Sequence, residues 1–161
     1  MKNFLLKDFI KQSTIASIYV VLVFIFQFLS FESIQFRIAE FLLILVFFDK
    51  KSIVGLLIGT FLANYLMSPY GLADALFGTL ASLLAMLLMI GFSKHKVIAL
   101  VFPALSNALV IGLMISLVNH IPFIPIALWV FLGEVVVMYL VGYPIFLYLN
   151  KDQHFKEMME S

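Results

Sequence analysis

The sequence contains no cysteine among its 161 residues, so disulfide bonds, thiolate metal sites and a cysteine nucleophile are all excluded. Charged residues are also scarce, at 12% of the chain, and the net charge is only +1. A protein that binds nucleic acid needs a basic face to neutralise phosphates, whereas the lysines here lie in small scattered clusters. We therefore expect no nucleic-acid partner.

The motifs of several enzyme classes are missing too. No G-x-x-x-x-G-K-[ST] motif occurs, so the chain lacks a P-loop with which to bind and hydrolyse ATP. G-x-S-x-G and H-E-x-x-H are also absent, and His95, His120 and His154 fall in expected loops or in the tail. We predict that the chain is not an enzyme, binds no metal or cofactor, and depends on other subunits for any ATP that drives its function.

Hydrophobic residues, by contrast, are abundant. They make up 64% of the chain, which includes 18 phenylalanines, and the mean hydropathy is +1.14. A soluble chain of this length buries only about 70% of its surface, so many of these side chains would form exposed apolar patches. The composition therefore predicts an integral membrane protein surrounded by lipid.

The apolar runs have the length of membrane-spanning helices, which need ~20 mainly apolar residues. The N-terminal segment lacks a signal-peptide cleavage site, so we interpret the first run as a retained helix. We predict an all-α membrane protein in which residues 1–161 form a single domain. Its bundle of six transmembrane helices covers roughly residues 13–30, 34–48, 53–67, 72–92, 97–118 and 124–149.

The lysines predict the orientation, because cytoplasmic ends of membrane helices are enriched in Lys and Arg. With six helices, one side of the membrane holds both termini and two loops, and these carry every lysine in the chain. The three opposite loops, around residue 32 and at 68–71 and 119–125, contain neither Lys nor Arg. We therefore predict a multi-pass protein of the cell membrane with both termini in the cytoplasm.

We single out seven polar residues within or close to the predicted helices, where a charged group costs about 2.5–3.5 kcal/mol and usually faces a cavity or a partner. They are Gln35, Arg37, Glu40, Asn64, Asp74, Asn107 and Glu134. The predicted topology places Gln35, Arg37, Asn64 and Asp74 in the outer half of the membrane. It places Asn107 and Glu134 nearer the middle. They could therefore converge on one outward-facing pocket for a small polar molecule.

Each candidate also has a structural explanation. Arg37 and Glu40 are three residues apart and could neutralise each other. Asp74 could cap the helix that follows it, and Asn64 and Asn107 could join helices by hydrogen bonds. Glu134 has no cationic residue within four positions, so a structural role would need a partner on another helix.

Five segments together resemble the QueT family of queuosine-precursor transporters. They are Q-F-R-I-A-E-F-L-L-I-L-V-F-F (35–48), G-L-L-I-G-T-F-L-A-N (55–64), G-L-A-D-A-L-F-G-T-L-A-S-L-L-A (71–85), N-A-L-V-I-G (107–112) and G-E-V-V-V-M-Y-L-V-G-Y-P (133–144). The resemblance implies the substrate-binding S component of an energy-coupling-factor transporter, with six helices and a ligand pocket near the outer surface. It also implies a transmembrane coupling subunit and two cytoplasmic ATPases as partners.

By the same resemblance, the ligand would be a 7-deazaguanine base such as queuine or its aminomethyl precursor. Its guanine-like edge suits a carboxylate, Glu134 or Glu40, together with the amide of Asn64 or Asn107, and Asp74 could pair with an aminomethyl group. S components often use Ala-x-x-x-Ala in the first helix to dock the coupling subunit. This chain has Ser13, Ala16 and Ser17 there instead.

Two other functions remain open at this stage. An autonomous secondary carrier would transport a small polar molecule without partner subunits, although its usual sign, an internal repeat, is not evident in the sequence. A structural membrane subunit would bind no ligand at all.

Overall fold

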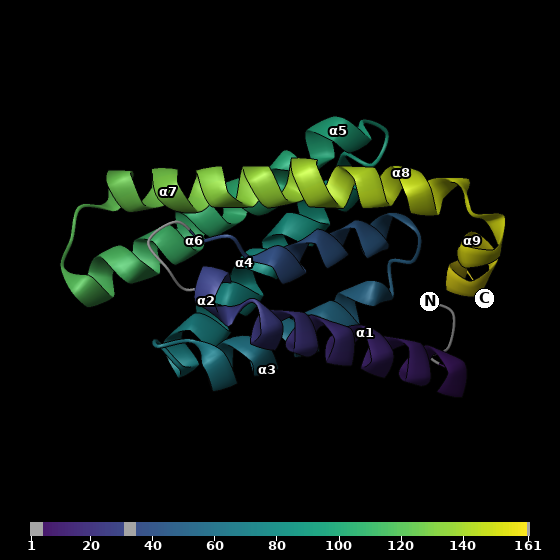
Figure 1. The fold of residues 1–161 in the computed structure, drawn as a ribbon, viewed down its shortest axis with the longest axis horizontal. Coiled ribbons are helices and arrows are strands. Elements are labelled where there is room, and N and C mark those ends of the chain that lie inside the picture. The colour runs from purple at the N-terminus through teal and green to yellow at the C-terminus, as the bar shows by residue number, and fades with distance from the viewer. Residues whose placement is uncertain (1–4, 31–34, 161) are drawn as a thin grey trace.

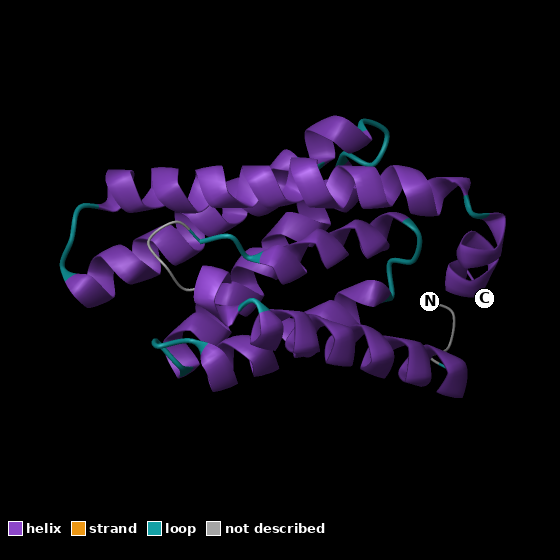
Figure 2. Cartoon of the chain, in the orientation of Figure 1, coloured by secondary structure: helices purple, strands orange, loops and turns teal. Residues whose placement is uncertain are grey.

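The computed structural model describes residues 5–30 and 35–160, and every regular element in these ranges is a helix (Figure 1). In chain order the elements are α1 (Leu6–Ile25), α2 (Gln27–Ser30), the 3₁₀-helix η1 (Ile38–Phe47), α3 (Ser52–Met67), α4 (Leu72–Gly91), α5 (Lys96–Ala99), α6 (Val101–Asn119), α7 (Phe123–Val136), the π-helix η2 (Val137–Gly142), α8 (Tyr143–Lys151) and α9 (Gln153–Glu160). Figure 2 shows only helices and loops in the described part of the chain. The prediction of an all-α fold is confirmed.

Four helical stretches in the described ranges are long and apolar enough to cross a membrane. They are Leu6–Ile25, Leu72–Gly91, Lys96–Asn119 and Phe123–Lys151. The apolar helices α3 and η1 are shorter: α3 is about 24 Å long at 1.5 Å per residue, and η1 about 20 Å at 2.0 Å per residue. Both fall short of the ~30 Å hydrocarbon core. The four longer stretches indicate a membrane protein, while six complete crossings stay a prediction.

The helix η1 differs most from its predicted form, which is a spanning α-helix over residues 34–48. It begins at Ile38, coils as a 3₁₀-helix, and contacts α1, α3, α4 and η2. Most of its side chains are buried, and Glu40 is the charged exception among apolar residues. A helix that is hydrophobic all round can lie in a protein core as well as in lipid, so the apolar run alone could not distinguish the two.

Glycines allow α1 and α3 to approach closely. A Cβ atom at Gly55 would lie 2.5 Å from the Gln12 carbonyl oxygen, and one at Gly59 would lie 2.8 Å from Tyr19 Cβ. Small residues at four-residue spacing permit such backbone contact in membrane helices. This packing buries Tyr19 in the interior of the bundle.

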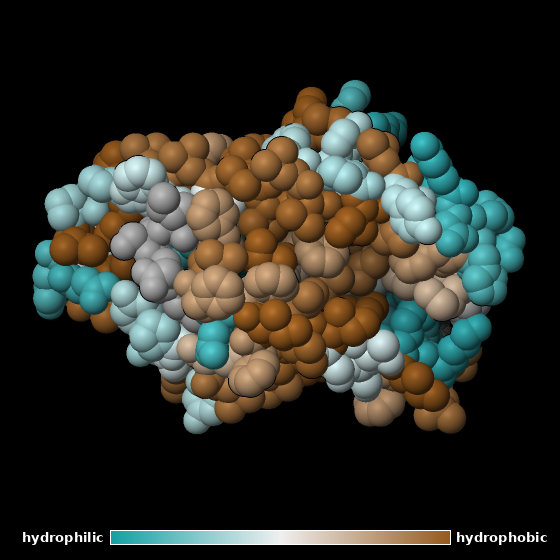
Figure 3. Space-filling view, viewed as in Figure 1, coloured by the Kyte–Doolittle hydropathy of each residue, from teal (hydrophilic) through white to brown (hydrophobic). Residues whose placement is uncertain are grey.

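Both described ends of the chain lie at the same end of the bundle, on the right in Figure 1. Figure 3 shows a hydrophobic band across the middle of the molecule and a hydrophilic group of residues at that end. Lys2 and the predicted loop around residue 32 lie outside the described residues. The side of the membrane that the shared end faces stays a prediction.

The first helix begins at Leu6, earlier than the predicted residue 13, and includes charged residues. Lys11 pairs with Asp49 at 3.0 Å, and Asp8 pairs with Lys51 at 2.6 Å. These pairs join the start of α1 to the connection between η1 and α3. The sequence-based boundary stops short of the charges because it cannot show that they are paired.

The last helix, α9, is not among the predicted segments. Its Phe155 ring packs edge-on against Phe48 with the ring centroids 5.3 Å apart. Lys11 Nζ also donates to the Met159 carbonyl at 2.6 Å, which holds α9 against α1. The sequence of α9 mixes polar and apolar residues, so it lacks the long apolar run that identifies the other segments.

Candidate functional site

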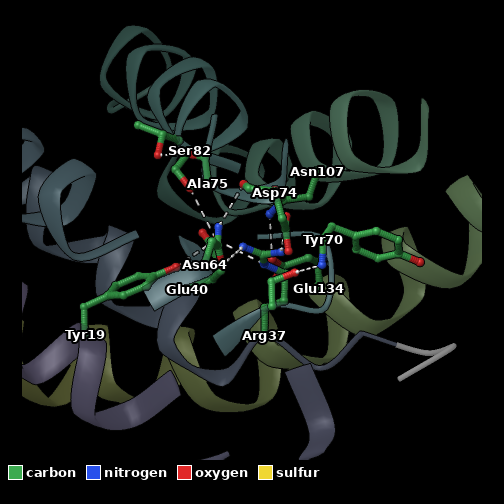
Figure 4. Close-up of polar contacts among 12 residues, drawn as sticks. Tyr19, Arg37, Glu40, Asn64, Tyr70, Asp74, Ala75, Ser82, Asn107 and Glu134 are labelled. Carbon is green, nitrogen blue, oxygen red and sulfur yellow. Dashed lines mark hydrogen bonds and ion pairs between the residues drawn. The ribbon is translucent and has the colours of Figure 1, made fainter. Parts of the chain in front are cut away.

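All seven predicted ligand residues are buried, with at most 4% of each residue exposed. They come from several elements: Gln35 and Arg37 precede η1, Glu40 lies on η1, Asn64 on α3, Asp74 on α4, Asn107 on α6 and Glu134 on α7. We call this set the polar cluster. Figure 4 shows that the six members it labels point toward one another in the interior of the bundle: Arg37, Glu40, Asn64, Asp74, Asn107 and Glu134.

Arg37 joins most of the polar cluster. Its Nε lies 3.4 Å from Glu40 Oε1, and its Nη1 lies 3.7 Å from Asp74 Oδ1. Its Nη2 donates to Asn64 Oδ1 at 3.2 Å, and Asn64 Nδ2 in turn donates to the Asp74 carbonyl at 3.3 Å. One guanidinium therefore binds side chains from three separate elements. Asn64 accepts from it through Oδ1 and is itself fixed to the α4 backbone through Nδ2.

Glu40 has two partners that sequence reasoning missed. The hydroxyl of Tyr19 donates to Glu40 Oε1 at 3.0 Å, and the hydroxyl of Ser82 donates to the same oxygen at 3.3 Å. All three side chains are fully or almost fully buried. Glu40 Oε1 thus contacts Tyr19 on α1, Ser82 on α4 and the Arg37 side chain. Glu40 Oε2 has no hydrogen-bond partner among the described residues.

Glu134 and Asn107 form a second part of the polar cluster. Asn107 Nδ2 donates to Glu134 Oε1 at 2.7 Å, so the pair joins α6 to α7. Because the amide nitrogen is the donor, Asn107 Oδ1 points away from Glu134 Oε1. Among the described residues, no basic side chain forms an ion pair with Glu134. This carboxylate therefore does have a partner on another helix, but that partner is neutral.

The polar cluster does not satisfy its own hydrogen-bonding capacity. Six of its buried atoms have no hydrogen-bond partner in the described protein: Gln35 Oε1, Arg37 Nη1, Glu40 Oε2, Asp74 Oδ1, Asn107 Oδ1 and Glu134 Oε2. Buried polar atoms are normally paired, and leaving one unpaired costs about 1–3 kcal/mol. No group of three His, Cys, Asp or Glu side chains within the described ranges is arranged to hold a metal ion. The arrangement is suited to hydrogen bonding with a polar molecule.

Two glycines fix the distances within the polar cluster. A Cβ atom at Gly78 would lie 2.2 Å from Asn64 Nδ2, so the absence of a side chain at Gly78 gives the Asn64 amide its place. A Cβ atom at Gly133 would lie 2.3 Å from the Gln35 carbonyl oxygen. Gly133 therefore lets the segment that carries Gln35 and Arg37 pack directly against α7, one residue before Glu134.

The space beside the polar cluster is small. A recess bounded by Tyr19, Val23, Ser30, Arg37, Ala39 and Asn64 has no room for a water-sized molecule. Ligand pockets usually measure ~300–1,000 Å³, so the described conformation is more closed than a loaded site would be. A larger hollow, of about 640 Å³, lies between α1, η1 and α9, but its lining is almost entirely apolar and includes no member of the polar cluster.

The structure decides between some of the structural explanations. Asp74 does not cap α4, because that helix begins at Leu72, its cap position is Gly71 and no side-chain capping bond forms. Arg37 and Glu40 do pair with each other, as their spacing indicates. Asn64 and Asn107 both join helices, although Asn107 keeps its oxygen unpartnered.

The predicted docking residues lie on two faces of α1. Ser13 and Ser17 are exposed, and Ser17 Oγ donates to the Ser13 carbonyl at 2.9 Å. Ala16 is buried, and its backbone would lie 3.1–3.2 Å from a Cβ atom at Gly59. Ala16 thus packs against α3 and presents no surface to another subunit here, whereas docking through Ser13 and Ser17 stays a prediction.

A comparison with protein families covers most of the chain. The family model for QueT transporters matches residues 9–151, a range that includes the whole polar cluster. The chain belongs to the QueT transporter family. The family predicted from the five sequence segments is therefore confirmed, and this QueT family member has a role in membrane transport. No match is found among curated proteins or among solved structures.

Proposed function

We propose that this QueT family member is the substrate-binding membrane subunit of an ATP-driven importer of the energy-coupling-factor type. It captures a queuosine precursor, a 7-deazaguanine base such as queuine or its aminomethyl precursor, from outside the cell and releases it into the cytoplasm. The observation that carries this proposal is the polar cluster, whose buried atoms lack partners on several elements at once.

The energetics of burial support a ligand at the polar cluster. Charged side chains at membrane depth cost about 2.5–3.5 kcal/mol each, and an unpaired buried polar atom costs about 1–3 kcal/mol. A guest molecule that hydrogen-bonds to several of these atoms offsets that cost when it binds. The described residues offer no hydrogen bond to Glu134 Oε2 or Glu40 Oε2, and Asp74 Oδ1 has only the ion pair with Arg37 Nη1 at 3.7 Å.

The chemistry of a 7-deazaguanine fits these atoms. Its guanine-like edge carries an N–H group beside an amino group, and carboxylate oxygens accept from both. Glu134 and Glu40 each keep one oxygen unpartnered, and Asn107 Oδ1 is a further acceptor. Asn64 has a different task, because both ends of its amide are already bonded and it positions Arg37.

Release requires movement and an energy source. The recess beside the polar cluster has no room even for a water-sized molecule, so the elements around the polar cluster separate to admit the base. The chain has no P-loop, so a transmembrane coupling subunit and two cytoplasmic ATPases supply the energy. Ser13 and Ser17, exposed on α1, form part of the surface that docks the coupling subunit.

Calorimetric titration of the purified, detergent-solubilised chain with queuine and with 7-aminomethyl-7-deazaguanine tests the binding step. We expect Glu134→Gln to weaken binding by about tenfold or more, because a hydrogen bond to a charged group contributes roughly 1.5–3 kcal/mol. Asp8→Asn is the matched control, since it also changes a buried carboxylate to an amide but lies in the ion pair with Lys51. The proposal fails if neither base binds to the folded protein.

Transport assays in liposomes separate the proposal from the other functions. We expect uptake of the base only when the coupling subunit and the ATPases are reconstituted together with the chain. Uptake by the chain alone would identify an autonomous carrier. A chain that binds no base, and that loses its fold when Glu134 becomes glutamine, would instead be a structural subunit.

A further inference from the structure

The apolar hollow between α1, η1 and α9 is long and narrow. Its volume is about 640 Å³, and its most buried lining residues include Ile15, Leu42 and Leu45. On α1 the lining runs from Leu6 to Ile18, a length of roughly 18 Å at 1.5 Å per residue. One leaflet of a bilayer supplies about 15 Å of hydrocarbon, half of the ~30 Å core. The hollow is therefore about as long as one leaflet is deep.

The basic residues of the lining lie at one end of the hollow. Lys7 and Lys11 are in the first two turns of α1, at the end of the bundle that is hydrophilic in Figure 3. Lys11 is already bound to Asp49 and to the Met159 carbonyl. Lys7 is exposed and forms no ion pair with any residue that the structure describes. The hollow thus combines an apolar channel with an unneutralised cation at its polar end.

The size of the hollow favours a lipid chain over a protein helix. A helix with its side chains is about 10–12 Å wide and rises 5.4 Å per turn, so each turn occupies roughly 400–600 Å³. The hollow would hold little more than one turn, whereas a thin acyl chain can follow its whole length. Leu6 and Ile10 at its rim are 77% and 60% exposed, so a chain can enter from the surrounding lipid.

The charge favours an anionic lipid over a neutral one. A phosphate without a compensating cation of its own gives Lys7 a counter-charge, whereas a zwitterionic headgroup supplies no net charge. Basic pockets between membrane helices bind anionic headgroups on the cytoplasmic side, where the leaflet itself carries anionic lipids. The lysine pattern predicts that this end of the bundle is the cytoplasmic one.

We propose that the hollow between α1, η1 and α9 is a binding site for one anionic phospholipid. An acyl chain lies along α1 against Leu42 and Leu45 of η1, and the phosphate pairs with Lys7. Phe155 of α9 also lines the hollow, so the lipid contacts α9 and η1 at once. The site lies apart from the polar cluster, and the proposal does not depend on which molecule the polar cluster binds.

Native mass spectrometry of the full detergent-solubilised chain tests this site. Dioleoyl phosphatidylglycerol and dioleoyl phosphatidylcholine are added at equal concentrations, because they share acyl chains and differ in headgroup charge. We expect one retained phosphatidylglycerol per chain and a preference of about fivefold over phosphatidylcholine, as one lysine near an anionic headgroup implies. Equal retention of the two lipids would refute the anionic selectivity, and retention of neither would refute the site.

Two pairs of variants locate the bound lipid. Lys7→Gln should remove the fivefold preference, whereas Lys50→Gln removes an exposed lysine that does not line the hollow and should preserve it. Thr14→Trp should fill the hollow and lose both lipids, whereas Val21→Trp adds the same bulk at an exposed position of α1 outside the hollow and should retain them.

Other results from these variants would overturn the proposal. An equal loss of preference in Lys7→Gln and Lys50→Gln would show a general effect of surface charge. Unchanged lipid retention in Thr14→Trp would place the lipid elsewhere on the protein. If the native chain retains neither lipid, and Thr14→Trp but not Val21→Trp loses co-purification with the coupling subunit, the occupant is a segment of that subunit.

Discussion

The substitution Gly78→Ala tests whether the Asn64 amide is held as the structure describes. The new Cβ atom would lie 2.2 Å from Asn64 Nδ2, far closer than two non-bonded atoms can approach, so the amide must move. That movement breaks the bond from Arg37 Nη2 to Asn64 Oδ1 and the bond from Asn64 Nδ2 to the Asp74 carbonyl. Arg37 would then lose the side chain that positions it.

The expected loss of stability follows from these two bonds. The bond from the charged guanidinium contributes about 1.5–3 kcal/mol, and the neutral bond about 0.5–1.5 kcal/mol. Alanine is favoured over glycine inside a helix by roughly 0.5–1 kcal/mol, which offsets part of that loss. The free energy of unfolding should therefore fall by about 1–4 kcal/mol.

Thermal unfolding of the detergent-solubilised protein measures this change, and Gly91→Ala on the same helix is the control. No atom lies within 4 Å of a Cβ built at Gly91, so that variant should be at least as stable as the native chain. For a protein of this size, the predicted loss corresponds to a fall in Tm of at least about 2 °C. If Gly78→Ala unfolds at the same temperature as Gly91→Ala, Asn64 is not held in this position.

Four further variants probe the polar cluster and the docking surface. Arg37→Gln leaves buried acids without a counter-charge, so we expect a loss of about 3–5 kcal/mol in thermal unfolding, and an unchanged Tm would contradict the ion pairs. Tyr19→Phe removes a donor to Glu40 and should cost about 1.5–3 kcal/mol in the same measurement. Glu134→Gln should leave the ligand-free protein as stable as before or more stable, because it neutralises a buried acid; a large fall in Tm would favour a packing role. Ser17→Trp should keep the native Tm but lose co-purification with the coupling subunit, and retained co-purification would place the docking surface elsewhere.

The sequence predicted the members of the polar cluster because charged and amide side chains are costly in apolar helices. The spacing of Arg37 and Glu40 also indicated their ion pair, since residues three apart lie on one side of a helix. Glu134 was informative for the opposite reason, because no nearby cation could explain it. In each case the signal lay within a few residues along the chain.

Tyr19 and Ser82 could not be found in this way. Tyrosine and serine are common in membrane helices, and nothing in the local sequence shows that their hydroxyls point at Glu40. Their direction depends on tertiary packing, and for Tyr19 the close contact between α1 and Gly59 of α3 sets it. The same packing buries Ala16, which sequence spacing alone had grouped with the exposed serines.

The sequence also could not predict that the second segment forms a buried 3₁₀-helix. Residues 38–47 are nearly all apolar. This pattern predicts burial, but it does not distinguish burial in lipid from burial in the protein core. In the structure, neighbours surround η1 on several sides and its tight coil spans more distance per residue than an α-helix does. Only the arrangement of the other helices shows that this run lies in the core and brings Glu40 with it.

The composition of the polar cluster itself argues for a ligand over a purely structural role. Side chains that only hold helices together are most stabilising when every buried oxygen is paired, and an apolar or amide side chain of similar size would often serve better than a carboxylate. Glu134 instead receives one bond from Asn107 and keeps its second oxygen unpartnered. A ligand present at 100 times its Kd would stabilise the protein by about 2.7 kcal/mol. An acid that weakens the empty protein and strengthens the loaded one is explained by what it binds.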